Sequence, residues 1–236
     1  MHKVNNWLNF DLFRPGCALC QAPLLPGQPL CPDCQAVLPH NRHACRRCAL
    51  PTAAGQTLCG RCLARPPHYH HSLIPFVYAR PIDRLITGLK FRQQLQNARL
   101  LGELLAHHLP AAHLASLDLL LPVPLHPRRL RERGFNQSLE ISRFIARQHD
   151  LPLLARHCHR VRHTEAQSNL PLAQRRRNLR QAFATDADLR GCSVGILDDV
   201  VTSGHTVNEL AHCLQRAGAE SITVIAVARA DFPVEA

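Results

Sequence analysis

Long apolar runs are missing from this chain of 236 residues. No stretch approaches the ~18 uninterrupted apolar residues that cross a bilayer as a helix. The first residues, Met1 to Trp7, also lack the apolar core of a secretory signal. We therefore expect a cytoplasmic protein with no membrane insertion. An apolar content of 46% is still enough for a packed core and argues against wholesale disorder.

Lysine is almost absent, although the chain is strongly basic. Lys+Arg 28 minus Asp+Glu 17 gives a net charge of +11, and Lys3 and Lys90 are the only lysines. The positive charge is therefore carried by arginine, whose planar guanidinium group binds phosphates well. This composition favours polyanionic partners, either nucleic acid or a pyrophosphate substrate. A surface charge that only keeps the protein in solution is the alternative.

Aromatic residues make up 5% of the chain, and none lies between Cys17 and Cys62. A segment this short and this poor in large apolar side chains cannot build its own core. What the segment has instead is cysteine, in four C-x-x-C pairs that repeat with a period of 28 residues. The paired residues are Cys17, Cys20, Cys31, Cys34, Cys45, Cys48, Cys59 and Cys62.

The cysteine pattern predicts metal binding. Each C-x-x-C turn can place two thiolates on one ion, and two such turns close a tetrahedral zinc site with no open position. We therefore expect a double zinc-ribbon module over residues 1–66, with up to two structural zinc ions that contribute to folding. Disulfides, the alternative, are unusual in a cytosolic chain. One site per repeat is the simplest pairing, and a cross-braced arrangement also fits the spacing.

A strand, two acids and the start of a helix follow one another near the C-terminus. The apolar run from Val194 to Leu197 predicts a buried strand that leads into Asp198 and Asp199. The next helix begins at Thr206, and a helix start at this place in an α/β sheet suits phosphate. Two carboxylates beside it suit ribose hydroxyls, directly or with Mg²⁺. The candidate phosphate-binding residues are Thr202, Ser203, Gly204, His205 and Thr206.

A second group of anion-binding residues follows an earlier predicted strand, Leu117–Val123. The loop after this strand is rich in arginine, and Asn136 beyond it can cap the next helix. The loop contains Arg128, Arg129, Arg131, Arg133, Gly134, Asn136 and Gln137. The alternative for this loop is a basic segment that only contacts solvent. The alternative for the acid pair is an ordinary strand-to-helix turn.

These motifs resemble those of known families. The Asp-Asp strand followed by Thr-Ser-Gly-x-Thr resembles the phosphoribosyl pyrophosphate (PRPP) loop of type I phosphoribosyltransferases. The signature Pro-Val-Pro…Arg-x-x-x-Arg-Gly-Phe-Asn-Gln-Ser resembles the ComF family. The resemblance implies that Asp198 and Asp199 hold the ribose, that residues 202–206 hold the 5′-phosphate, and that the arginine-rich loop holds pyrophosphate.

The stretch from Arg160 to Phe183 is similar to a further segment of the same family, with Ala166 in place of the usual proline. Its place matches the hood that closes over the substrate in phosphoribosyltransferases. A lid that excludes water suits an oxocarbenium-like ribosyl cation, which water would intercept. The candidate hood residues are Gln167, Arg176 and Asn178.

The sequence thus predicts an α/β protein with a type I phosphoribosyltransferase fold over residues 67–236. We expect a parallel sheet flanked by helices, with a hood, after the small double zinc-ribbon module and its four-cysteine sites. The resemblance implies a role in the uptake or use of DNA. It also implies PRPP, single-stranded DNA and proteins of the DNA-uptake machinery as partners.

Two functions remain open at this point. The first is Mg²⁺-dependent phosphoribosyl transfer from PRPP, driven by positioning and electrostatics. Thr202 stands where purine-specific members often carry an aspartate, and threonine cannot act as a base near neutral pH. The second is a non-catalytic role in single-stranded DNA binding or as an adaptor, regulated through the PRPP site. Scarce aromatic residues limit base stacking, so DNA affinity would depend on phosphate contacts and on salt.

Overall fold

The computed structural model describes residues 16–24, 27–161 and 182–230. The chain divides into two compact units, Met1–Leu38 and Pro39–Ala236. The first cysteine repeat lies in the smaller unit and the second lies in the larger one. This division follows packing, whereas the predicted boundary at residue 66 follows the cysteine repeat.

The larger unit is built on a parallel sheet in which the two long strands are central. Strand β6 (Ser193–Val201) pairs with β7 (Ser221–Arg229), and Asp198 lies opposite Ala226. The strand order is β1-β7-β6-β3, and β2 also pairs with β7. The outer strands are β1 (His71–Leu73), β2 (Phe76–Val77) and β3 (Leu119–Pro122).

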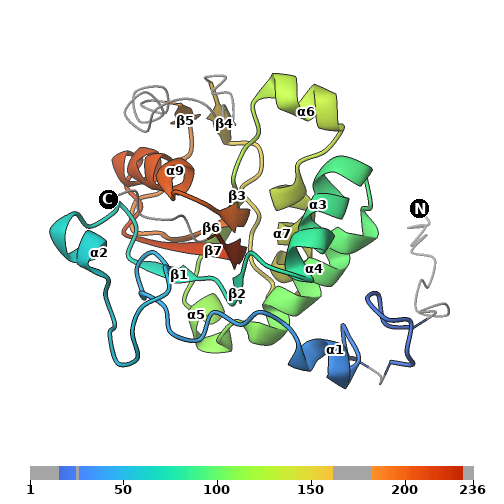
Figure 1. The fold of residues 1–236 in the computed structure, drawn as a ribbon. Helices are drawn as coiled ribbons and strands as arrows, with labels where there is room; N and C mark the ends of the chain where they lie inside the picture. Colours follow the sequence, from blue (N-terminus) through green and yellow to red (C-terminus); the bar gives the residue numbers. More distant parts are fainter. Residues whose placement is uncertain (1–15, 25–26, 162–181, 231–236) are drawn as a thin grey trace. The chain divides into compact units, whose positions relative to one another are not determined.

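Helices cover both faces of this sheet, as Figure 1 shows. One face is covered by α3 (Ile82–Arg92), α4 (Gln96–His108) and α7 (Gln137–Gln148), and the other by α9 (His205–Arg216). Strand β7 is apolar almost throughout because parallel strands between two helix layers bury both of their faces. The short helix α5 (Ala111–Ala115) precedes β3. These elements confirm the predicted α/β class.

The predicted cap and helix after the arginine-rich segment are both present. The Asn136 side chain accepts hydrogen bonds from the backbone N–H groups of Ser138 and Leu139, at 3.0 and 3.4 Å, and so starts α7. The arginines before it do not lie on a loop, as the sequence led us to expect. They form the helix α6 (Pro127–Arg133), which begins with a proline in its first turn and ends at Gly134 in the left-handed conformation.

A separate two-stranded antiparallel sheet is formed by β4 (Cys158–Arg160) and β5 (Phe183–Thr185). These strands contain the two ends of the segment that is predicted to form the hood. Gln167, Arg176 and Asn178 lie outside the described residues. Pro75 lies between β1 and β2 and separates these two short strands.

Each cysteine repeat contributes one short helix, α1 (Pro32–Ala36) in the smaller unit and α2 (Gly60–Ala64) in the larger. Tight turns precede both helices. Gln21 N–H donates to the carbonyl of Cys17 at 2.8 Å, and Ala49 N–H donates to that of Cys45 at 2.7 Å. Within the described ranges no helix is long and apolar enough to span a bilayer.

Gly102 permits the close crossing of α4 and α7. A β-carbon at this position would lie 2.7 Å from Cβ of Phe144 and 3.2 Å from the carbonyl oxygen of Ile141. We predict that Gly102→Ala lowers the free energy of unfolding by about 1–3 kcal/mol, because the two helices must separate. Urea denaturation measures this change. Alanine normally stabilises a helix by about 1 kcal/mol over glycine, so a gain in stability would contradict the prediction.

Candidate functional site

The acid pair lies on β6 and is held by two different helices. Ser138, at the start of α7, donates its hydroxyl hydrogen to Oδ1 of Asp198 at 3.0 Å. The same oxygen accepts the backbone N–H of Asp199 at 2.9 Å. Asp199 is only 3% exposed and forms an ion pair with Lys90, near the end of α3. The pair is therefore fixed by contacts from residues far apart in the sequence.

Burial has a large effect on the first of these carboxyl groups. It raises the pKa of Asp198 to about 7, and the neighbouring charge of Asp199 acts in the same direction. Lys90 and the hydrogen bond from Ser138 oppose the rise. The site thus holds a carboxyl group that gains or loses its proton near neutral pH.

Positive side chains stand around the acids. Arg133 at the end of α6 donates to Oε1 of Gln137 at 2.5 Å, and its charge interacts with that of Asp199. Arg160 on β4 is half-buried, and its charge interacts with that of Asp198. Burial lowers the pKa of both arginines, and the charge of Arg129 lowers it further. We call Lys90, Arg129, Arg133 and Arg160 the basic rim.

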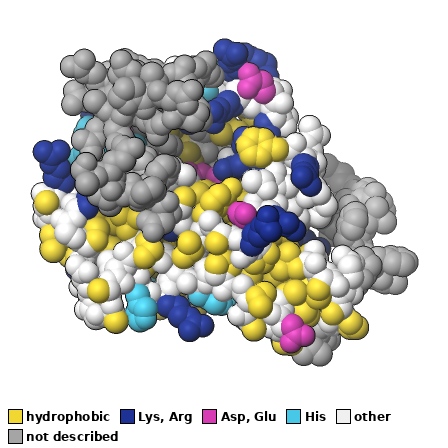
Figure 2. Space-filling model, viewed as in Figure 1, with side chains coloured by type: hydrophobic (Ala, Val, Ile, Leu, Met, Phe, Trp, Pro, Cys, Tyr) yellow, Lys and Arg dark blue, Asp and Glu magenta, His cyan; other side chains and the backbone are white. Residues whose placement is uncertain are grey.

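The remaining arginines of α6 point elsewhere. Arg128 is exposed and pairs with Glu132 one turn later, at 3.0 Å. Arg131 is also exposed. In Figure 2 Lys and Arg side chains gather over the region of α6 and α3, with hydrophobic side chains among them. The basic rim faces the acid pair, and the outer arginines widen the positive surface around it.

The candidate phosphate loop, Thr202 to Thr206, follows the last residue of β6 directly. Gly204 adopts a φ of 77°, and α9 starts at the next residue. This left-handed conformation suits glycine best. The N-cap residue Gly204 has no side chain that could cap the helix, and the Ser203 hydroxyl accepts the His205 N–H at a long 3.5 Å. The Ser203 hydroxyl lies 2.9 Å from Nδ1 of His205. The start of α9 thus offers backbone N–H groups and a positive dipole end to an anion.

The cysteines form one cluster per repeat, so the cross-braced alternative is wrong. The four Sγ atoms of each repeat lie within 4.8 Å of one another. The first cluster is Cys17, Cys20, Cys31 and Cys34, and the second cluster is Cys45, Cys48, Cys59 and Cys62.

The geometry of both clusters fits zinc. The Sγ atoms of Cys20 and Cys31 are 3.5 Å apart, and those of Cys48 and Cys59 are 3.6 Å apart. A tetrahedral site with Zn–S bonds of ~2.3 Å spaces its sulfur atoms by about 3.8 Å. A disulfide would require about 2.05 Å. All 11 cysteines are free. Both clusters are therefore structural zinc sites that leave no position for a substrate.

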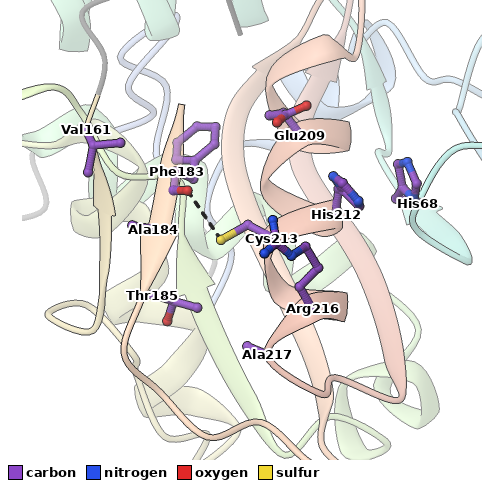
Figure 3. A pocket seen from close by; sticks show the side chains of 10 residues that line it. All are labelled: His68, Val161, Phe183, Ala184, Thr185, Glu209, His212, Cys213, Arg216 and Ala217. Carbon is purple, nitrogen blue, oxygen red and sulfur yellow. Dashed lines mark hydrogen bonds between the residues drawn. The ribbon is translucent and has the colours of Figure 1, made fainter. Parts of the chain in front are cut away.

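A pocket of about 760 Å³ opens beside α9, away from the acid pair (Figure 3). Phe183 and Thr185 of β5 line one side, and Cys213 of α9 donates to the Phe183 carbonyl at 3.5 Å. His68 and His212 stack at the other side with ring centroids 4.4 Å apart. The pocket contains neither the acids nor the phosphate loop.

Sequence patterns found the acids and the arginines but missed the groups that hold them. Lys90 lies about a hundred residues before the acids, and only its rarity in an arginine-rich chain could have marked it. Ser138 and Arg160 lie within stretches that the motifs covered, yet their contacts with the acid pair depend on packing. Thr202, the first residue of the phosphate loop, is exposed.

Comparison with known proteins shows what kind of module the cysteine repeats form. Residues 11–63 match the double zinc ribbon domain family. The protein therefore combines zinc ribbons with a parallel α/β sheet that carries an acid pair. A purine phosphoribosyltransferase from Pyrococcus horikoshii matches 61% of this chain and 90% of its own, at 17% identity and a TM-score of 0.33. That likeness carries no weight here, and the α/β assignment rests on the strand pairing.

Two named relatives identify the family. Competence protein F of Haemophilus influenzae is 35% identical over 160 residues, which is 65% of this chain and 70% of that protein. DNA utilization protein YhgH of Escherichia coli K12 is 37% identical over 160 residues, covering 64% and 69%. The chain belongs to the family of these proteins, as the ComF signature predicted.

The raised pKa of Asp198 predicts how stability depends on pH. Its folded-state pKa lies above that of a free aspartate, so its contribution to stability is complete below about pH 4 and is lost as the pH rises through about 7. Asparagine offers an Oδ1 that accepts the same two hydrogen bonds and never ionises. We predict that the free energy of unfolding of Asp198→Asn, measured relative to that of the wild type, rises by roughly 1–2 kcal/mol between pH 5 and pH 8. Chemical denaturation at both values measures this, and a constant difference would contradict it.

Proposed function

We propose that this chain is a DNA-utilisation protein of the competence type that binds PRPP with Mg²⁺. The observation that carries the proposal is the buried acid pair on β6, which lies shortly before the start of α9 and faces the basic rim. The acid pair faces the basic rim and lies shortly before the phosphate loop along the chain. PRPP presents the matching groups, namely ribose hydroxyls, a 5′-phosphate and a pyrophosphate. The family's named functions in competence and DNA utilisation supply the biological context.

Each part of the site has a distinct task in this proposal. Asp198 and Asp199 accept hydrogen bonds from the ribose hydroxyls. The N–H groups and hydroxyls of residues 202–206 bind the 5′-phosphate. The basic rim, with Gly134, Asn136 and Gln137 close behind it, receives the pyrophosphate. Mg²⁺ bound to PRPP would neutralise part of the pyrophosphate charge.

Phosphoribosyl transfer is the chemistry that such a site can support. The bond from ribose C1′ to the pyrophosphate oxygen breaks, the pyrophosphate leaves with the bonding electrons, and an acceptor nucleophile bonds to C1′. The basic rim stabilises the charge that develops on the leaving group. Nothing in this scheme needs a protein nucleophile. Thr202 itself offers no base for the acceptor.

Calorimetric titration with PRPP and Mg²⁺ tests the binding step. We predict that Asp198→Asn and Asp199→Asn weaken binding at least tenfold, because each removes a charged acceptor for the ribose hydroxyls. Asp118→Asn is the matched control, since Asp118 accepts the N–H of Ser193 at 2.7 Å, at the opposite end of β6. Equal affinity for the wild type and both site variants, or no binding at all, would reject the proposal.

A second candidate function is single-stranded DNA binding, and one observation favours it. Phe91 is 73% exposed although it is aromatic, and the guanidinium group of Arg133 lies 5.7 Å from its ring centroid. It directly follows Lys90, so an aromatic face stands beside the basic rim. Single-strand binding sites combine these features, because bases stack on rings while phosphates contact arginines. This ring supplies a stacking partner in a chain that has few.

Substitution of Phe91 separates stacking from charge. We predict that Phe91→Ala weakens binding of a labelled single-stranded oligonucleotide by about 1–3 kcal/mol, at least fivefold, and that Phe91→Trp retains it. The slope of affinity against salt should stay the same, since no phosphate contact is lost. Leu95→Ala serves as the control, because Leu95 is also apolar and exposed nearby. Unchanged affinity after Phe91→Ala would exclude this ring as a stacking platform.

A further inference from the structure

We infer that the second cluster positions the phosphate loop, through Arg229 and Arg61. This inference rests on the proposed function, in which residues 202–206 bind phosphate. It assigns a ligand-positioning task to a zinc site that otherwise only stabilises the fold.

Arg229 is the central link. It is the last residue of β7, is only 2% exposed, and reaches two segments far apart in sequence. Its Nε donates to the carbonyl of Cys48 at 2.9 Å, and its Nη1 donates to that of Val201 at 2.8 Å. Nη1 also contacts the carbonyls of Thr202 and Ala230. One buried guanidinium group therefore joins a zinc ligand's backbone to the first residue of the phosphate loop.

Arg61 supplies a second link from the same zinc knuckle. It lies on α2, between the ligands Cys59 and Cys62, and its Nη2 donates to the carbonyl of Ser203 at 3.3 Å. The metal fixes both cysteines, and so fixes where this short helix starts and which way it points. The carbonyls of two successive loop residues are thus held from the zinc side.

Peptide geometry makes these carbonyl contacts matter for ligand binding. In a planar trans peptide the C=O of one residue and the N–H of the next point in opposite directions. Carbonyls of Thr202 and Ser203 that point toward the arginines therefore turn the N–H groups of Ser203 and Gly204 away from them. Those N–H groups are the donors that a phosphate at the start of α9 would use.

The charge of a filled zinc site strengthens the arrangement. Four thiolates and one Zn²⁺ carry a net charge of −2, and a buried guanidinium group stays protonated. The two attract each other across the Cys48 carbonyl. Because coupling between two binding sites is reciprocal, a phosphate ligand at the loop should raise the zinc affinity of the second cluster by the same factor by which zinc raises the ligand affinity.

Matched cysteine variants of the full chain test this coupling. Cys59→Ser removes a ligand from the second cluster, and Cys31→Ser removes the equivalent ligand, 28 residues earlier, from the first cluster. We expect Cys59→Ser to speed amide hydrogen exchange at residues 203–206 and to weaken PRPP binding at least tenfold. Cys31→Ser should change neither property. Equal effects of the two variants would overturn the inference.

Arginine variants test the route without removing the metal. Arg61→Ala and Arg229→Lys should keep two zinc ions per chain, yet speed exchange at residues 203–206 and weaken PRPP binding about fivefold. Arg65→Ala, an exposed arginine just after α2, is the control. If Cys59→Ser also speeds exchange in β7, it has loosened more than the loop, and the arginine variants then decide whether the second cluster positions the loop. Wild-type exchange and affinity in both arginine variants would overturn the inference.

The exchange measurement keeps the two proposals apart, because it needs no ligand. If the wild type binds no PRPP, the proposed function fails, while loop exchange still reports whether zinc positions the loop. If PRPP binds but loop exchange ignores the second cluster, the coupling fails and the proposed function stands.

Discussion

Two adjacent carboxylates on a buried strand impose the main constraint on this protein. Neighbouring negative charges in a poorly hydrated place repel each other and cannot both ionise without compensation. The fold supplies it from three directions, with Lys90 from α3, Ser138 from α7 and Arg133 from α6. The three helices must therefore converge on one end of β6. Helix α7 packs directly on β6, and α4 crosses α7 closely at Gly102.

The cysteine repeat solves a different physical problem with the same chain. Segments of about thirty residues without aromatic side chains bury too little apolar surface to fold by themselves, and metal coordination replaces the missing core. The second cluster also uses the large sheet as a support. Ser72 N–H donates to the carbonyl of Arg46 at 2.9 Å, and Arg229 donates to that of Cys48 at the same distance. Coordination and packing thus act together in the larger unit.

Local patterns predicted what local physics determines. The spacing of the C-x-x-C pairs indicated two four-cysteine sites, Asn136 marked the start of α7, and an apolar run located β6. Contacts between distant segments were not visible in this way. Nothing near Lys90 or Arg229 in the sequence indicates that one meets Asp199 and the other meets Cys48. The arginine-rich stretch was expected to be a loop, but it forms α6, and Pro127 is typical of the first turn of a helix.

The two repeats share their ligands, and one of the positions at which they differ lies between two of these ligands. Arg61 of α2 corresponds, 28 residues earlier, to Asp33 of α1. An ionised carboxylate can only accept hydrogen bonds, so the first copy has no donor with which to hold a carbonyl at this position. The duplication has therefore diverged in side-chain chemistry while its metal sites stayed alike. The basic side chain gives the second copy a hydrogen bond to the Ser203 carbonyl that an acid at this position could not donate.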